Sequence, residues 1–245
     1  MKGVVFAFSV ICLVSSSAHA LELSNEFSLD MKFSLLSQYR TRGVSENQND
    51  PAAQFEGILS SKSTGLYLGL FTTNVDYGHS SPSRQELDYY AGWSIPLAKG
   101  VTFDIGGVQY TYIKENEKNY TETYASLSAY GFVLTAQYSD DFPALGKDQS
   151  IFYAWASYEV KIPYDFKLLS RYGIMDYKDP FFISADGTTR DAYHEWEVKL
   201  SKTYLGLDWG VSYIDTDLSK NECLYAAGFK DVCTAAAVFS VTKKI

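Results

Sequence analysis

Charged side chains repeat at every second position in several segments of the chain. Glu86 and Asp88 form one such pair, and Glu195 and Glu197 form another. Residues two apart on a β-strand point to the same side, so each pair directs two carboxyl groups into one space. Inside a barrel, unpaired carboxylates of this kind favour the passage of cations. The alternative interpretation is an internal salt-bridge network that fills the barrel and only supports it.

The candidate lining charges extend beyond these two pairs. They comprise the acids Glu86, Asp88, Glu122, Glu195, Glu197 and Asp208, with Lys32 and Lys199 as counter-charges. Each lies in a segment where polar and apolar residues alternate, so all are expected to face a polar interior. Both the ion-selective lining and the supporting network fit this pattern.

Two arginines lie where the first expected strand, 27–39, meets a polar loop at 41–51. These are Arg40 and Arg42, and as a functional pair they would face acids across a constriction and influence ion preference. The acids considered as their partners are Asp50, Glu56, Glu86 and Asp88. Alternatively, the arginines bind lipopolysaccharide phosphates at an outer rim or hold the loop in place. Gly43 beside them is expected to serve a loop backbone conformation rather than a ligand.

Catalytic chemistry is not indicated by the sequence. His79 lies in an expected loop beside Ser80 and Ser81, which are too near in sequence to form an oriented nucleophile–base pair easily. His194 alternates onto an apolar face with Trp196. The sequence has no Gly-x-Ser-x-Gly elbow, metal-spaced His/Cys set or phosphate-cradling glycine loop. We therefore expect no catalytic residue, metal or cofactor, and an outer-membrane lipid hydrolase is a less favoured alternative.

The composition fits a barrel with a polar lining. The 245 residues carry a net charge of −8, which disfavours nucleic acid as a partner because that requires clustered Lys and Arg. Mean hydropathy is slightly negative, at −0.15, as expected if only alternate positions are apolar. Aromatic residues make up 16% of the chain, which suits the aromatic girdles at the two interfaces of a membrane barrel.

Twelve segments have the period-two pattern or the residue content of strands. Alternation is clearest in 27–39, 86–95, 120–129, 193–201 and 205–213. The other segments are 52–60, 65–75, 101–113, 131–139, 150–160, 166–176 and 234–242. No helix of useful length is expected, because the chain is rich in β-branched and aromatic residues and lacks a 3.6-residue stripe.

The connections between these segments alternate in length. Short ones fall at 61–64, 96–100, 129–131, 161–165 and 202–204, and longer ones at 41–51, 76–84, 114–119, 140–149, 178–191 and 216–232. Membrane barrels show this alternation because tight turns form the periplasmic rim and long loops the extracellular rim, whereas a soluble sandwich has no reason to keep it. We predict an all-β fold, a closed antiparallel transmembrane β-barrel of about 12 strands with both termini periplasmic.

The first 20 residues have the pattern of an export signal. Lys2 gives the positive start, 4–14 the apolar stretch, and Ala18-His19-Ala20 an Ala-x-Ala cleavage pattern. Residues 21–245 would then form one barrel domain. Cys223 and Cys233 remain after cleavage, and in an oxidising compartment we expect them to form a disulfide, with two separate thiols as the alternative.

A set of short motifs runs through the mature chain. They are Tyr39-Arg40-Thr41-Arg42-Gly43-Val44-Ser45, Asn49-Asp50-Pro51-Ala52, Asn74-Val75-Asp76, Glu86-Leu87-Asp88-Tyr89-Tyr90-Ala91-Gly92, Asn119-Tyr120-Thr121-Glu122-Thr123-Tyr124-Ala125, Asp215-Thr216-Asp217-Leu218 and Val238-Phe239-Ser240-Val241-Thr242-Lys243. In these motifs the chain resembles the TorF-like family of proteobacterial outer-membrane porins. One departure is that the chain ends on Ile245, where proteins of this kind usually end on an aromatic residue.

The resemblance and the residue pattern together give one expected function. We expect an outer-membrane porin that lets small polar or ionic solutes diffuse through a narrow charged lumen. Expected partners are these solutes, outer-membrane lipid and lipopolysaccharide, and the outer-membrane assembly machinery. The main alternative is a plugged barrel whose outer loops bind a partner or anchor the envelope, and a secreted soluble β-protein is a further one.

Overall fold

The computed structural model describes residues 21–79, 81–144 and 147–245. The export signal predicted at 1–20 lies outside these residues. Within them, no helix is long and apolar enough to span a membrane.

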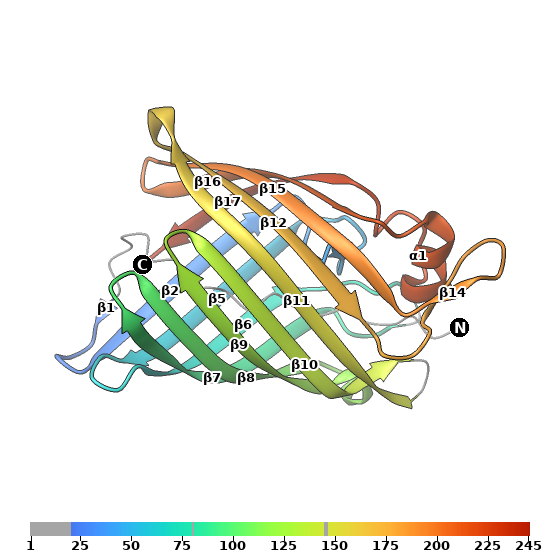
Figure 1. The fold of residues 1–245 in the computed structure, drawn as a ribbon, viewed down its shortest axis with the longest axis horizontal. Coiled ribbons are helices and arrows are strands. Elements are labelled where there is room, and N and C mark those ends of the chain that lie inside the picture. The colour runs from blue at the N-terminus through green and yellow to red at the C-terminus, as the bar shows by residue number, and fades with distance from the viewer. Residues whose placement is uncertain (1–20, 80, 145–146) are drawn as a thin grey trace.

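Twelve strands of the described chain form one closed antiparallel barrel (Figure 1). In chain order they are β2 (Phe27–Leu36), β5 (Ala52–Ser61), β6 (Leu66–Asn74), β7 (Gln85–Ala98), β8 (Val101–Tyr112), β9 (Tyr120–Ala129), β10 (Phe132–Ala144), β11 (Lys147–Ile162), β12 (Phe166–Asp176), β15 (Ala192–Tyr204), β16 (Leu207–Thr216) and β17 (Ala236–Lys244). Each pairs with the next along the chain, and β17 pairs with β2 to close the ring. The predicted fold class is confirmed, and each predicted segment overlaps one of these strands.

The remaining elements are not among these twelve strands. They are β1 (Leu21–Glu22), β3 (Arg40–Thr41), β4 (Val44–Ser45), η1 (Asn116–Lys118), η2 (Pro163–Asp165), β13 (Phe182–Ile183), β14 (Thr189–Arg190) and α1 (Lys220–Ala227).

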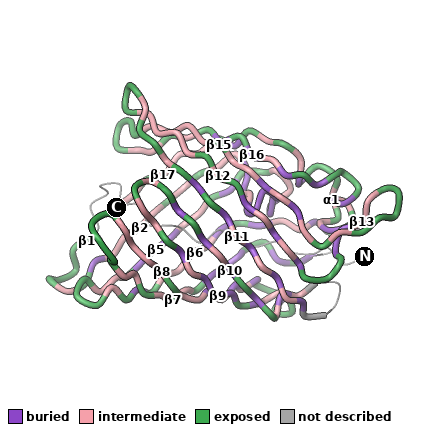
Figure 2. The backbone as a smooth tube through the Cα atoms, viewed as in Figure 1, coloured by how far each residue is buried: buried purple, intermediate pink, exposed green. Residues whose placement is uncertain are grey.

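Alternation along each strand separates an apolar outer face from a largely polar inner face. On β16, Trp209, Val211 and Tyr213 are exposed outside, whereas Ser212 is buried inside. Exposed and buried positions alternate in this way along the strands (Figure 2). The period of two in the sequence is therefore the direct cause of the wall's two faces.

The two ends of the barrel differ in their connections. At the turn end, the strands join through 62–65, 99–100, 130–131, 163–165 and 205–206. Tyr130 and Gly131 have φ of 52° and 91°, the positive values that a tight two-residue hairpin turn requires. At the loop end the connections include 37–51, 75–84, 113–119, 177–191 and 217–235. The C-terminus lies at the turn end, opposite α1 (Figure 1).

One predicted loop is replaced by strand. The connection expected at 140–149 is wrong, because β10 and β11 continue to pair as far as Ala144 and Lys147. The polar residues that suggested a loop are accommodated by a register shift between Ser139 and Phe142.

The longest loop contains a helix that the sequence pattern did not predict. The helix α1 begins after Ser219, whose side chain accepts from the Glu222 backbone N–H in a capping box. It ends at Gly228, which has φ of +82°. Cys223 in α1 and Cys233 form the predicted disulfide. The helix is only two turns long, which is too short to show an apolar stripe in the sequence. Its cap residues and the disulfide fix its position instead.

The barrel closes along a short seam between β2 and β17. Five residue pairs form this ladder, from Ser240 with Leu36 to Lys244 with Lys32, whereas the ladder between β2 and β5 has ten. Beyond it, the Ser37 backbone N–H donates to the Phe239 carbonyl oxygen at 2.8 Å.

After this point the chain leaves the wall and enters the barrel. The strand predicted at 27–39 ends at Leu36, so the prediction is wrong for its last three residues. Residues 38–47, here called the inner hairpin, turn back through β3 and β4. Gly43 forms the turn with φ of +80°, and a Cβ there would collide with the side chains of Thr216 and Glu195. Its predicted role in backbone conformation is consistent with this geometry.

Candidate functional site

The inner hairpin fills the loop half of the barrel interior. Every residue from Thr41 to Asn47 is buried. Val44 belongs to one continuous apolar cluster with wall residues such as Tyr110 and loop residues such as Phe182. The loop half of the lumen is therefore a packed core rather than an open channel.

Arg42 anchors the inner hairpin to the wall. Its side chain is 0% exposed, and one terminal nitrogen lies 2.7 Å from both carboxyl oxygens of Glu122 on β9. The Tyr110 hydroxyl also donates to Glu122, at 3.0 Å, and the Tyr193 hydroxyl donates to the Arg42 carbonyl oxygen at 2.9 Å. The guanidinium lies 4.8 Å from the centre of the Tyr153 ring. These contacts satisfy a buried charge from several directions and fix its position.

Arg40 is bound within its own loop. It donates to the Gln38 side chain at 2.7 Å, to the Gly43 carbonyl at 2.8 Å and to the Asn49 side chain at 2.9 Å. Arg40 thus holds the shape of the inner hairpin, as the loop-holding alternative proposed. The acids considered as partners of the two arginines, namely Asp50, Glu56, Glu86 and Asp88, are not the groups they bind. Sequence spacing could not show this, because the hairpin folds inward and reaches β9 instead of β7.

Glu86 and Asp88 lie on the inner face of β7, enclosed by protein. Both side chains are 0% exposed, and neither forms an ion pair with any residue that the structure describes. Glu46 of the inner hairpin is buried nearby and interacts electrostatically with Glu86. These acids point inward, as predicted, but they line no open space.

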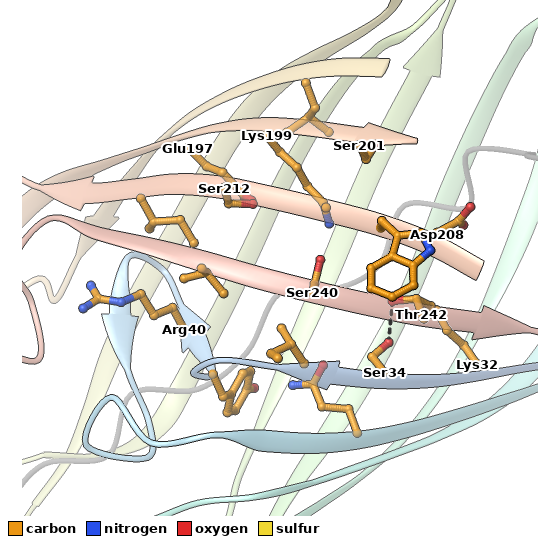
Figure 3. A pocket seen from close by; sticks show the side chains of 18 of the residues that line it. Lys32, Ser34, Arg40, Glu197, Lys199, Ser201, Asp208, Ser212, Ser240 and Thr242 are labelled. Atoms are coloured by element: carbon orange, nitrogen blue, oxygen red, sulfur yellow. Dashed lines mark hydrogen bonds between the residues drawn. The ribbon is translucent and has the colours of Figure 1, made fainter. Parts of the chain in front are cut away.

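The turn half of the lumen holds a cavity of about 400 Å³, here called the vestibule. Strands β2, β12, β15, β16 and β17 supply most of its wall, and Arg40 and Thr41 of the inner hairpin lie at its inner end. Figure 3 shows Lys199 reaching into it near Ser240. Its charged and hydroxyl-bearing lining residues are Lys32, Ser34, Arg40, Thr41, Glu56, Glu159, Lys167, Arg171, Glu197, Lys199, Ser201, Lys202, Thr203, Asp208, Ser212, Ser240, Thr242, Lys244 and Tyr39.

Most vestibule charges are paired across neighbouring strands. The Lys32 amine lies 2.6 Å from Glu56, and the Lys244 amine lies 2.8 Å from Asp208. Lys199 has no acid within salt-bridge distance among the described residues. With Arg40 bound by neutral groups, the vestibule carries an excess of positive charge. This sign is opposite to the cation preference that unpaired acids would give.

Glu195 and Glu197 belong to a network between the vestibule and the filled half. One Arg171 nitrogen lies 3.2 Å from Glu195 and 3.5 Å from Glu197. The Tyr153 hydroxyl donates to Glu195 at 2.7 Å, and the Ser212 hydroxyl donates to Glu197 at 2.6 Å. These two acids therefore have the geometry of the supporting salt-bridge network rather than of free lining groups.

The two histidines of the mature chain lie apart from the vestibule lining. His194 lies on the outer face of β15, with its ring centre 5.5 Å from that of Tyr172. His79 is exposed in the loop 75–84. Ser81 donates to the Glu115 carboxylate, and Ser80 lies outside the described residues. No group of three or more His, Cys, Asp or Glu is placed to hold a metal in the part of the chain that the structure describes.

Two important interior residues were missed by the sequence reasoning. Arg171 shares one face of β12 with Leu169 and Gly173, but aromatic residues on both faces of neighbouring segments obscured which side points inward. Glu46 lies in a polar loop without periodicity, so no signal placed it inside the barrel.

The closed barrel with its charged interior defines a porin-like fold. A solved structure of the KdgM porin has a TM-score of 0.51 and 9% identity, covering 88% of this chain and 97% of that one. A solved structure of the NanC porin has a TM-score of 0.54 and 11% identity, covering 87% of this chain and 97% of that one. At these identities the likeness is one of fold.

The chain belongs to a bacterial family, Gcw_chp, which is described as a bacterial protein of unknown function. The family model matches residues 20–245. A comparison with curated proteins finds no match. The likeness to porins agrees with the predicted class of protein, whereas the resemblance to the TorF-like family stays a prediction.

Proposed function

We propose that the protein is an outer-membrane porin through which small polar or ionic solutes diffuse passively. The observation that carries this proposal is the vestibule, a charge-lined cavity inside a closed barrel. Diffusion through such a lumen requires no reaction chemistry, because width and charge alone select the solute. A porin of the TorF-like kind fits this arrangement.

The outer surface supports a position in the membrane. Leu35, Leu134, Phe132 and Phe239 are each about 60% exposed on the barrel wall. A wall of exposed apolar residues is unfavourable in water and favourable against lipid chains. The turn end would then face the periplasm and the loop end the cell exterior, next to lipopolysaccharide. The signal at 1–20 and the outer-membrane assembly machinery would deliver the chain there.

The inner hairpin is the barrier to diffusion in this proposal. A solute entering from the loop end must pass the packed core around Val44 and Arg42. Conduction therefore requires displacement of the inner hairpin, so we expect a channel that is closed for much of the time.

Planar-bilayer conductance tests the proposal directly. We expect discrete conductance steps from the purified wild-type protein. A variant with residues 38–47 replaced by a flexible Gly-Ser linker should show larger and more frequent steps. Slower gel migration after heating serves as the control that each variant is a folded barrel. Silence from both folded proteins at all voltages would contradict the porin function.

A plugged barrel with a structural or surface-binding role is the second candidate. It is favoured by the buried Arg42–Glu122 pair and the filled loop half. The loops at that end, including α1 and its disulfide, would then bind a partner. In the bilayer experiment this candidate predicts a silent wild type and conductance only in the linker variant.

A further inference from the structure

Buried acids gather where the inner hairpin contacts the wall. Glu46 of the inner hairpin is 1% exposed, and Glu86 and Asp88 on β7 are both 0% exposed. Within the described chain none of them forms an ion pair. The Glu86 and Asp88 carboxyl groups interact with each other, and their few other polar neighbours are the Thr111 backbone beside Asp88 and the Tyr77 hydroxyl beside Glu46. Three carboxyl groups therefore share one dry region that has little to stabilise negative charge.

The groups around Glu46 supply few compensating charges. From the inner hairpin itself come Tyr39 and Arg42, from β7 come Glu86 and Asp88, from β8 comes Tyr112, and from the surrounding loops come Tyr77, Lys118 and Tyr177. Arg42 is paired with Glu122 at 2.7 Å, and Lys118 with Glu115 at 3.0 Å. The nearby cations are thus already engaged by other acids.

This composition determines the charge state of the seated hairpin. An ionised carboxylate without a partner is very costly to bury, and such groups bind a proton instead. Ionising Glu46 and Glu86 together would also place like charges on the hairpin and on the wall it contacts. The packed arrangement is therefore compatible with neutral acids and strained by ionised ones.

We propose that protonated Glu46, Glu86 and Asp88 keep the inner hairpin seated in the barrel, and that their ionisation releases it. The release itself does not depend on transport. Only its consequence, an opened pore, rests on the proposed porin function.

The titration of Glu46 gives the direction of the effect. Its burial, and then the neighbouring charge of Glu86, raise the pKa of Glu46 well above the ordinary value of 4.5. As pH rises above that ordinary value, the released hairpin loses a proton that the seated hairpin retains. Each pH unit then favours release by up to about tenfold for each such carboxyl, until the pKa of the seated form is reached.

The inner hairpin is the part that would move. On the wall, β7 is held by a ladder to β6 from Gln85 to Trp93 and by a ladder to β8 from Glu86 to Ala98. The inner hairpin has only two residue pairs of its own, Arg40 with Ser45 and Thr41 with Val44. Its other attachments are mainly side-chain contacts and a few loop hydrogen bonds, so repulsion displaces the hairpin before it displaces the wall.

Thiol labelling of a buried hairpin residue tests the release without using conductance. Ser45→Cys places a single free thiol in the hairpin, since Cys223 and Cys233 are bonded to each other. The barrel in detergent is labelled with a maleimide between about pH 5 and about pH 9, in the Ser45→Cys protein and in the same protein with Glu46→Gln. Dividing the first rate by the second removes the pH dependence of thiol chemistry.

We expect this ratio to rise about tenfold or more across the pH range. Adding Glu86→Gln to the Ser45→Cys protein should reduce this rise, whereas adding Asp50→Asn, which changes an exposed acid in the same loop, should leave it unchanged. Heat-dependent gel mobility again confirms a folded barrel. A flat ratio in folded protein would overturn the proposal, even if the wild type conducts. A rising ratio with a silent bilayer would support the hairpin mechanism and reject the porin function.

Discussion

At the scale of single residues, Arg42 and Glu122 form a buried ion pair that stabilises the fold only while both partners are present. Arg42→Met leaves the Glu122 carboxylate buried without a cation, which we expect to cost about 3–5 kcal/mol in the free energy of unfolding. The double variant with Glu122→Gln should recover much of this loss, because no buried charge remains. Urea unfolding in detergent, followed by gel mobility, measures both. Equal stability of Arg42→Met and the wild type would contradict the role of the pair.

Lys199 is the residue through which we expect the vestibule to influence ion preference. Its amine faces the cavity without an acid partner, so Lys199→Gln should shift the reversal potential in a salt gradient towards cations. Lys230→Gln is the matched control, because it carries the same charge change and Lys230 is exposed in the loop 217–235, outside the vestibule lining. An equal shift in both variants would exclude a specific role for Lys199. Glu86 and Asp88 would contribute only after the inner hairpin is displaced.

At the scale of elements, the cap formed by α1 and the segment at Arg190 depends on one carboxylate. Partial burial alone would raise the pKa of Glu222, but hydrogen bonds from Ser219 and Arg190 outweigh it and lower that pKa below its ordinary value. Arg190 donates to Glu222 at 2.7 Å and to Asp217 at 3.1 Å. A carboxyl group whose pKa is lowered in the folded state stabilises that state at pH values above its ordinary pKa of 4.5. This stabilisation is lost as the pH falls through the pKa of the folded state.

We therefore expect the cap to loosen in acid while the barrel remains folded. The protection factors of the amides in 220–227, which compare the observed exchange rate with the intrinsic rate at the same pH, should fall below about pH 4 in the wild type. Glu222→Gln should show a comparable loss of protection already at neutral pH, with Glu117→Gln in the separate loop at η1 as the control. If exchange of α1 in Glu222→Gln equals that of the wild type at neutral pH, the carboxylate does not hold the cap.

Comparison of individual elements shows why some could be predicted from the sequence and others could not. The strand β9 was predicted with its observed bounds because polar and apolar residues alternate without interruption from Tyr120 to Ala129. The alternation also runs through Ser37 to Tyr39, yet the chain there turns inward. Local pattern contains no information about that turn, which is set by contacts with Glu122 and Tyr193 far along the chain.

At the scale of the whole molecule, the sequence determines the barrel more directly than it determines the interior. A period of two and alternating connection lengths suffice for twelve antiparallel neighbours, because each ladder but one joins consecutive barrel strands. The interior depends on which side chains meet across the lumen, such as Lys32 with Glu56 or Arg171 with Glu195. The division of the lumen into a filled half and a vestibule follows from those side-chain contacts, so it could be seen only in the structure.

The seam between β2 and β17 has a consequence for how the chain reaches its native state. Every other barrel ladder joins barrel strands that are consecutive along the chain, and these hairpins can form early through local contacts. The seam joins residues such as Ser34 and Thr242, which are separated by 208 positions. The five residue pairs of the seam offset only a small part of the entropy lost on closing so long a loop. Ring closure should therefore be the last and slowest step of folding, and until it occurs the chain is an open sheet with two unpaired edges.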